Sequence, residues 1–174
     1  MACKNGNEII VKYLANKGAN LFIEDKNGRT PLHIACENGN VKVVKFLVEN
    51  KADINKCNIK VETPLKIACR KVNENVVKYL VEQGVEINKE GWDINKPIHD
   101  VYINRNENIF KCLIENGADI DDSMVFLECK NGNKAIVKYF IEYGTSINEQ
   151  DKMEKSLLYY ASQNGNEATE KISS

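Results

Sequence analysis

The stretch TPLHIAC at residues 30–36 recurs as TPLKIAC at residues 63–69, a shift of 33 positions. A second shift of 33 reaches KPIHDVY at residues 96–102, which keeps the proline and an apolar residue after it. Self-similarity at a fixed period of this size is the sequence signature of a repeat architecture. The period therefore governs how the rest of the chain is interpreted.

The second half of each unit repeats with the same period. VVKFL at 43–47 is followed by VVKYL at 76–80 and IFKCL at 109–113, and is preceded by IVKYL at 10–14. IVKYF at 136–140 comes after a step of only 27, and SLLYYA at 156–161 opens a last unit. We therefore predict one array over 1–174 with six units, approximately 1–24, 25–57, 58–90, 91–121, 122–150 and 151–174.

Each unit is predicted to contain a turn, a short helix, a break, a longer helix and an extended connector. Thr30 is a suitable N-cap, and Pro31 suits the first helical position, where its missing N–H costs nothing. Gly39 can take the left-handed conformation that ends the first helix. Val43, Val44 and Leu47 mark one apolar face of the second helix. Because two such short helices cannot bury their apolar faces alone, neighbouring units must stack.

The unit DKNGRTPLHIA at 25–35, followed by Gly39 and by ADIN at 52–55, resembles an ankyrin repeat. The resemblance covers essentially the whole chain and implies an all-α solenoid of stacked helix-turn-helix repeats with extended β-turn connectors. Ala2 aligns with Ala35 and Ile172 with Phe46, so we expect the terminal units to be partial and the array to be part of a larger protein. The resemblance also implies a protein-interaction module, with a substrate-positioning array of a larger enzyme or a mechanical spacer as alternatives.

Composition and charge narrow the class of protein. Hydrophobic residues make up 43% and charged residues 28% of the 174 residues, which is typical of a folded protein. The net charge of −1 and the lack of interleaved aromatics argue against nucleic acid as a partner. We see neither an apolar stretch of roughly 20 residues nor a signal peptide. We expect a monomer in the cytoplasm, or in the nucleus, that makes no membrane contact.

Four of the six cysteines recur in one repeat register, at Cys3, Cys36, Cys69 and Cys129. Equivalent helices of adjacent repeats lie about 8–10 Å apart, whereas a disulfide needs Cα atoms within about 7 Å. We therefore expect small, buried, reduced thiols rather than disulfides.

No catalytic constellation is visible, so we predict no enzyme activity, no cofactor and no metal site. His33 and His99 are the only histidines and share one motif position. The resemblance implies that this position hydrogen-bonds to the turn backbone. No Cys/His/Asp cluster with ligand spacing accompanies either histidine.

The resemblance places the partner on the connector tips and on the concave face of the first helices. The residues at those offsets are Lys26, Asn27, Arg29, Ile59, Lys60, Glu62, Arg70, Lys71, Trp92, Asp93, Asn95, Ile103 and Asn104. A wider set adds Lys4, Asn5, Glu37, Asn38, Lys130, Asn131, Lys152 and Lys155. Basic residues outnumber acidic ones in this set by nine to three. An excess of this sign favours a protein partner with an acidic surface. The alternative is that these lysines are simply solvated.

Trp92 is the only tryptophan and falls at a connector tip. Tryptophan is enriched among interface hot spots. We consider two roles for it, a binding hot spot that Ile59 extends, or local packing, since Ile94 replaces the glycine found at Gly28.

Three departures from the pattern predict irregular geometry. The connector between residues 118 and 123 is too short for a projecting turn. Glu128 falls where Ala35 and Ala68 lie, so we expect it either to reach water or to pair with a basic neighbour. Val72 and Arg105 replace the glycine of the helix break, so we expect the following residue, Asn73 or Asn106, to take the left-handed geometry.

Asparaginyl hydroxylation of the connector is a further property that the resemblance implies. Asn55 fits that pattern, with Asp53 and Leu47 upstream, and Asn88 fits it less well. The alternative is that each asparagine only caps its turn.

Overall fold

The computed structural model describes residues 2–88, 96–148 and 150–163. The chain divides into two compact units, Met1–Ala118 and Asp119–Ser174. The division falls at the short connector around residue 119, where we expected an irregularity. Each unit is described separately below.

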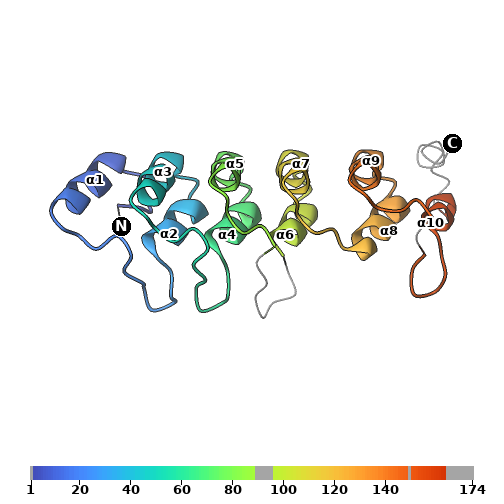
Figure 1. The fold of residues 1–174 in the computed structure, drawn as a ribbon, viewed down its shortest axis with the longest axis horizontal. Coiled ribbons are helices and arrows are strands. Elements are labelled where there is room, and N and C mark those ends of the chain that lie inside the picture. The colour runs from blue at the N-terminus through green and yellow to red at the C-terminus, as the bar shows by residue number, and fades with distance from the viewer. Residues whose placement is uncertain (1, 89–95, 149, 164–174) are drawn as a thin grey trace. The chain divides into compact units, whose positions relative to one another are not determined.

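The first unit contains seven helices in its described part. They are α1 (Glu8–Asn16), α2 (Pro31–Glu37), α3 (Val41–Glu49), α4 (Pro64–Arg70), α5 (Glu74–Glu82), α6 (Pro97–Ile103) and α7 (Glu107–Glu115). α1, α3, α5 and α7 form one row, and α2, α4 and α6 form a second row beside it (Figure 1). Each helix contacts its partner in the same repeat or the equivalent helix of the next one. This is the predicted stack of paired helices.

Local chemistry sets where these helices begin. Pro31 and Pro64 occupy the first turn of α2 and α4. The Thr63 hydroxyl accepts the Lys66 N–H at 3.2 Å, which satisfies one of the unbonded donors at the start of α4. α7 begins in the same way, because the Asn106 side chain accepts the Ile109 N–H at 2.8 Å. The predicted starts of these helices are confirmed.

The core of the first unit is the apolar stripe of the second helices. Leu47, Leu80 and Leu113 are spaced by one period and are each 0% exposed. Burying such a side chain contributes about 1.5–3 kcal/mol. Leu14 has the same register position in α1 but is 44% exposed. α3, α5 and α7 each pack against a first helix and against the second helix of the repeat before, whereas the main helix contact of α1 is with α3.

An asparagine at the start of the second helix joins neighbouring repeats. Asn40 Nδ2 donates to the Cys3 carbonyl at 2.7 Å, and Asn73 Nδ2 donates to the Cys36 carbonyl at 2.7 Å. We call this contact the asparagine bridge. Cys36 lies near the end of α2, whereas Cys3 lies in a turn before α1, and the bridge adds a second donor to each carbonyl beside the N–H of Gly39 or Gly6.

The expectation for the non-glycine helix breaks was wrong. Val72 and Arg105 themselves adopt the left-handed conformation, with φ of 58° and 53°. Asn73 and Asn106 keep negative φ, at −86° and −88°. The reason is that the N–H of the break residue closes the first helix, as Val72 N donates to the Cys69 carbonyl at 3.0 Å. The left-handed conformation is therefore set by the position in the repeat, since Gly39, Val72 and Arg105 all adopt it.

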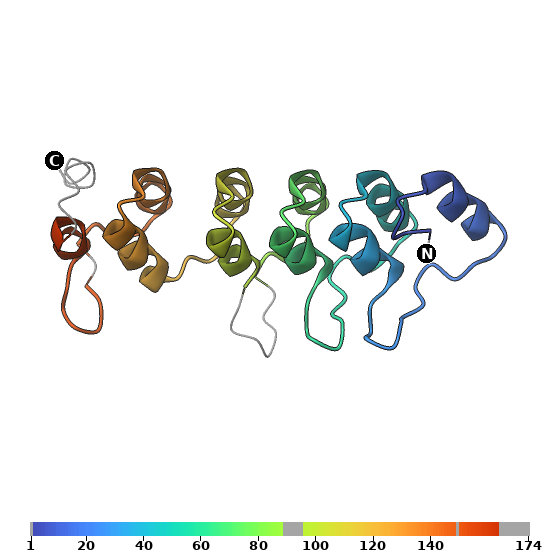
Figure 2. The same cartoon turned by 180° about the vertical axis from the view of Figure 1, so that it is seen from behind.

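The second unit contains α8 (Asp122–Asn131), α9 (Lys134–Glu142) and α10 (Leu157–Gln163) among its described residues. α8 contacts both α9 and α10 (Figure 2). α8 begins at Asp122, only a short distance after α7 ends at Glu115, whereas the connectors before α2 and α4 run over 17–30 and 50–63. The predicted loss of the projecting turn is confirmed.

Glu128 lies on α8 and is only 6% exposed, so the expectation that it reaches water was wrong. Asn131 Nδ2 donates to its carboxylate at 3.3 Å. A buried carboxylate needs such donors, because its desolvation is costly. Pairing of Glu128 with a basic neighbour stays a prediction.

All six cysteines are free thiols, and Cys36, Cys69 and Cys129 are buried. Burial raises the pKa of the Cys36 thiol far above its ordinary value, and raises the pKa of Cys129 to about 11. Because the thiolate is the reactive form, these buried cysteines are chemically inert. None of the helices in the described ranges has the length and apolar character needed to cross a bilayer.

Candidate partner-binding site

Two connectors of the first unit project side by side from the row of first helices (Figure 1). We call residues 17–30 and 50–63 the two fingers. Each tip is organised by one polar side chain, because Asp25 Oδ1 accepts the Asn27 and Arg29 N–H groups and Asn58 Oδ1 accepts the Glu62 N–H. Ile59 N donates to the Asn27 carbonyl at 3.0 Å and ties one tip to the other. The tips are thus held in fixed positions.

A cavity of about 290 Å³ lies between the fingers and the first helices, and we call it the finger hollow. It is lined by Asn27, Arg29, Glu37, Asn58, Ile59, Lys60, Glu62, Ile67 and Arg70. Ile67 is buried, whereas Ile59 is 70% exposed at the tip of its finger. A large apolar side chain exposed beside polar groups is the composition expected of a binding surface.

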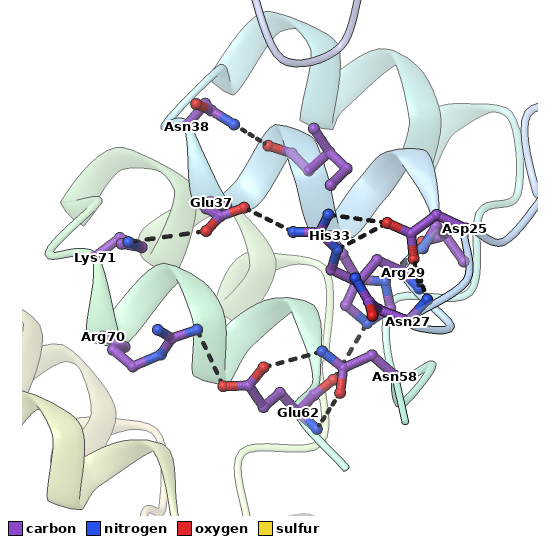
Figure 3. A network of polar contacts seen from close by, with 12 residues as sticks. Asp25, Asn27, Arg29, His33, Glu37, Asn38, Asn58, Glu62, Arg70 and Lys71 are labelled. Carbon is purple, nitrogen blue, oxygen red and sulfur yellow. Dashed lines mark hydrogen bonds and ion pairs between the residues drawn. The ribbon is translucent and has the colours of Figure 1, made fainter. Parts of the chain in front are cut away.

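Charged side chains around the hollow form a network across two repeats (Figure 3). Arg29 lies between Asp25, at 2.9 Å, and Glu37, at 3.3 Å. Lys71 lies 3.8 Å from the other oxygen of Glu37. Exposed pairs of this kind contribute little to stability, typically under about 1 kcal/mol each. Their main effect is to orient the side chains.

A second branch of the network lies over α4. Arg70 lies 3.0 Å from Glu62 Oε1, and Asn58 Nδ2 donates to Glu62 Oε2 at 3.0 Å. Glu62 therefore connects the tip of the second finger to the end of α4. Three of the basic residues counted from sequence, Arg29, Arg70 and Lys71, have a carboxylate partner on this same surface. The sequence count already included Glu37 and Glu62, so Asp25 is the one acidic partner here that the count left out.

The structure brings most of the predicted site residues together. Six of them line the finger hollow, namely Asn27, Arg29, Ile59, Lys60, Glu62 and Arg70. Lys71 joins them through Glu37, and Asn104 Nδ2 donates to the Arg70 carbonyl at 3.2 Å. Ile103 is exposed on α6 and Lys26 at the first fingertip. Trp92, Asp93 and Asn95 lie outside the described residues.

Sequence reasoning missed two residues that organise the site, Asp25 and Asn58. They are one period apart, and Asp151 plays the same part in the second unit by accepting the Met153 and Lys155 N–H groups. Hydrogen bonds from the Arg29 backbone, and then from Asn27, hold the pKa of Asp25 below its ordinary value. The signal was available, because Asp and Asn at the start of a tight turn accept backbone N–H groups two residues on.

The histidines are structural, as expected. His33 Nδ1 accepts the Thr30 N–H at 3.1 Å, so its proton lies on Nε2, which faces the Glu62 carbonyl at 3.2 Å. His99 Nδ1 accepts the Lys96 N–H at 3.1 Å. His33 thereby joins one finger to the next. Within the part of the chain that the structure describes, no group of three or more His, Cys, Asp or Glu is placed to hold a metal ion.

Acidification is expected to destabilise the first unit through His33. Burial lowers the pKa of His33 below the value of about 6.5 that it has in an unfolded chain. Below pH 6.5 the unfolded chain therefore binds a proton that the folded chain excludes, and the free energy of unfolding falls as the pH drops from about 7 to 5.5. Urea unfolding across this range measures the slope.

The control for this prediction is His33→Gln, whose side chain can still accept the Thr30 N–H. Its free energy of unfolding should change less with pH over the same range. Parallel pH profiles for the two proteins would show that another group is responsible.

The connector asparagines considered for hydroxylation are both engaged. Asn55 accepts the Glu86 N–H at 2.9 Å and donates to the Glu86 carboxylate at 3.0 Å. Asn88 Nδ2 donates to the Gly117 carbonyl at 2.8 Å. Each therefore joins its connector to the next repeat. Hydroxylation of either residue stays a prediction.

Comparison with known families identifies the repeat. A family model described as ankyrin repeats (3 copies) matches residues 1–58 and 98–172, and one described as ankyrin repeats (many copies) matches residues 36–81. The chain belongs to the ankyrin repeat family. Ankyrin repeats are in general modules for protein–protein interaction and are typically not catalytic. No curated protein matches this ankyrin repeat chain.

Proposed function

We propose that the chain is a non-catalytic protein-interaction module of the cytoplasm that binds its partner through the finger hollow and the adjoining ends of α2, α4 and α6. The observation that carries this proposal is the hollow itself. It combines an exposed apolar anchor, Ile59, with polar side chains fixed by a network of hydrogen bonds and ion pairs. Anchors of this kind, held in advance of binding, reduce the entropy that association costs.

The rigidity of the scaffold supports the same proposal. The fingers rise from helices whose packing residues are almost completely buried, such as Leu32 at 1% and Leu65 at 0% exposure. A loop displayed on a rigid framework is the usual place for recognition residues. The remaining predicted residues at this surface, among them Lys26, Ile103 and Asn104, extend the contact area beyond the hollow.

A comparative pull-down from a lysate of the source organism tests the proposal. The site variant combines Ile59→Ala, Lys60→Ala and Arg70→Ala. The control combines Ile9→Ala, Lys42→Ala and Lys78→Ala, which likewise removes one exposed isoleucine and two exposed cationic side chains, but from the second helices. We expect at least one protein to be retained by the wild type and the control and lost from the site variant, with unchanged melting temperatures.

The other outcomes separate the alternatives. A protein lost equally from both variants would place the binding surface elsewhere. No captured protein at all would favour the mechanical spacer. Capture of a protein that contains a catalytic domain would favour the alternative in which the array positions substrate for an enzyme.

A further inference from the structure

We propose that the finger hollow binds an acidic, extended peptide segment, with one carboxylate of the peptide held between Arg29 and Arg70 and a neighbouring aliphatic side chain lying on Ile59. This inference rests on the proposed function and specifies the chemistry of the partner. It is carried by three features of the hollow, which are the unequal exposure of its charges, the loose contacts of Glu37, and the position of Ile59.

Arg70 and Lys71 are more accessible than the carboxylates with which they pair, whereas Arg29 is 32% exposed, the same as Glu37 and less than Asp25. The Arg70 side chain is 41% exposed while its partner Glu62 is 16% exposed, and Lys71 is 42% exposed while Glu37 is 32% exposed. Lys26 and Lys60 are also exposed at the fingertips. Asp25 is the exception, but its carboxylate is occupied by two backbone N–H groups and by Arg29. A ligand that approaches over α4 and the fingertip lysines therefore meets positive charge first, which favours an acidic ligand.

Glu37 is the carboxylate that a ligand can most easily replace. It lies 3.3 Å from Arg29 and 3.8 Å from Lys71, whereas Asp25 and Glu62 contact their arginines at 2.9 and 3.0 Å. Charge-assisted hydrogen bonds are normally 2.7–2.9 Å long and are strongest when bidentate. A peptide carboxylate could therefore take over the Arg29 NH1 donor while Glu37 stays beside Lys71.

Ile59 defines the second half of the recognition. Its side chain lies at the tip of the second finger and lines the same hollow as Arg29 and Arg70. In an extended peptide, side chains two residues apart point in the same direction. An acidic residue in the hollow and an aliphatic residue two positions away can then contact Arg70 and Ile59 together.

The same surface is poorly suited to nucleic acid. Among the described residues that line the hollow there is no aromatic side chain on which a base could stack.

Selection from an unbiased phage-displayed library of random 12-residue peptides, with the full chain as bait, tests the inference. We expect enriched peptides to contain an Asp or Glu two positions away from an aliphatic residue. A synthetic copy of the enriched peptide should bind about tenfold or more weakly to Arg70→Glu, because a charge-assisted bond becomes a repulsion. Lys42→Glu, on the second-helix side, should bind as the wild type does.

Glu37→Gln gives the sharpest test, because its expected effect is a gain. Removing the competing carboxylate should tighten binding of the acidic peptide by about two- to fivefold. If the hollow instead received a basic side chain through Glu37, this variant would weaken binding. A loss of affinity in Glu37→Gln would therefore overturn the inference, as would enrichment of neutral or basic peptides, or no enrichment.

A single-stranded 20-nucleotide oligonucleotide serves as the competing ligand. The inference would also be overturned in favour of nucleic acid if the oligonucleotide bound more tightly than the acidic peptide and Arg70→Glu abolished that binding. Failure of the proposed function is distinguishable, because the pull-down would then show no partner that depends on the site variant. If the pull-down finds a partner that is lost from the site variant while the library enriches basic peptides, the proposed function is supported. The acidic segment is then rejected.

Discussion

Replacing Leu47 by alanine is expected to lower the free energy of unfolding by about 3–5 kcal/mol. Leu47 is 0% exposed on α3, between the helices of its own repeat and those on either side. The truncation removes the transfer free energy of the lost methyl groups and leaves a cavity that helices packed on several sides cannot close. Urea unfolding followed by far-ultraviolet circular dichroism measures the loss.

Leu14→Ala is the matched control, since Leu14 holds the same register position one repeat earlier. Its side chain is 44% exposed, so the same change should cost less than about 1 kcal/mol. The pair separates the effect of stacking from the effect of residue type. Equal losses in the two variants would contradict this expectation. They would mean that the Leu14 side chain is buried in the folded protein in solution.

The second large effect is expected at Gly39, where Gly39→Val should lower the free energy of unfolding by about 2–4 kcal/mol. Gly39 has φ of 69°, which strains a residue with a Cβ by about 1–2 kcal/mol. A Cβ at this position would also lie 2.7 Å from Asn73 Oδ1 and displace the asparagine bridge to Cys36. The Cys36 carbonyl keeps the Gly39 N–H as a donor, so the lost hydrogen bond itself contributes only about 0.5–1.5 kcal/mol.

The reverse change, Val72→Gly, should stabilise the protein by about 0.5–1 kcal/mol. Val72 has φ of 58° at the position equivalent to Gly39 and is 39% exposed, so glycine relieves strain while little packing is lost. Thermal unfolding of both single variants provides the comparison. A destabilised Val72→Gly would show that the valine side chain makes a contact worth more than the strain it causes.

The fold could be predicted from sequence because the repeats can be aligned with one another within the chain. The recurrence of the Leu47 position at Leu80 and Leu113 identified the buried stripe, and the prolines at 31 and 64 identified the starts of first helices. These features depend on residues close in sequence or one period apart. Six of the residues that line the finger hollow were selected because the resemblance to ankyrin repeats implied a partner surface there, whereas Asn58 was missed.

The parts that could not be predicted depend on competition between side chains. Whether Glu37 pairs with Arg29, with Lys71 or with both is decided by distances between two repeats. The left-handed residue at Val72 was misassigned because intrinsic preference favours asparagine there, while the hydrogen bond that closes α4 requires the residue before it. The alignment of Glu128 with Ala35 and Ala68 indicated a buried position, but it could not show that Asn131 would donate to the carboxylate.

The asparagine bridge bears on how such a chain can lengthen by duplication. Asn40 and Asn73 form the same bond with carbonyls one repeat back, at Cys3 and Cys36, so a copy of residues 25–57 inserted beside the original would meet a matching junction at both borders. The junction after Val72 is different, because Asn106 donates to the Glu74 carboxylate instead. The repeats are therefore not freely interchangeable, and copying is tolerated best where a glycine closes the first helix.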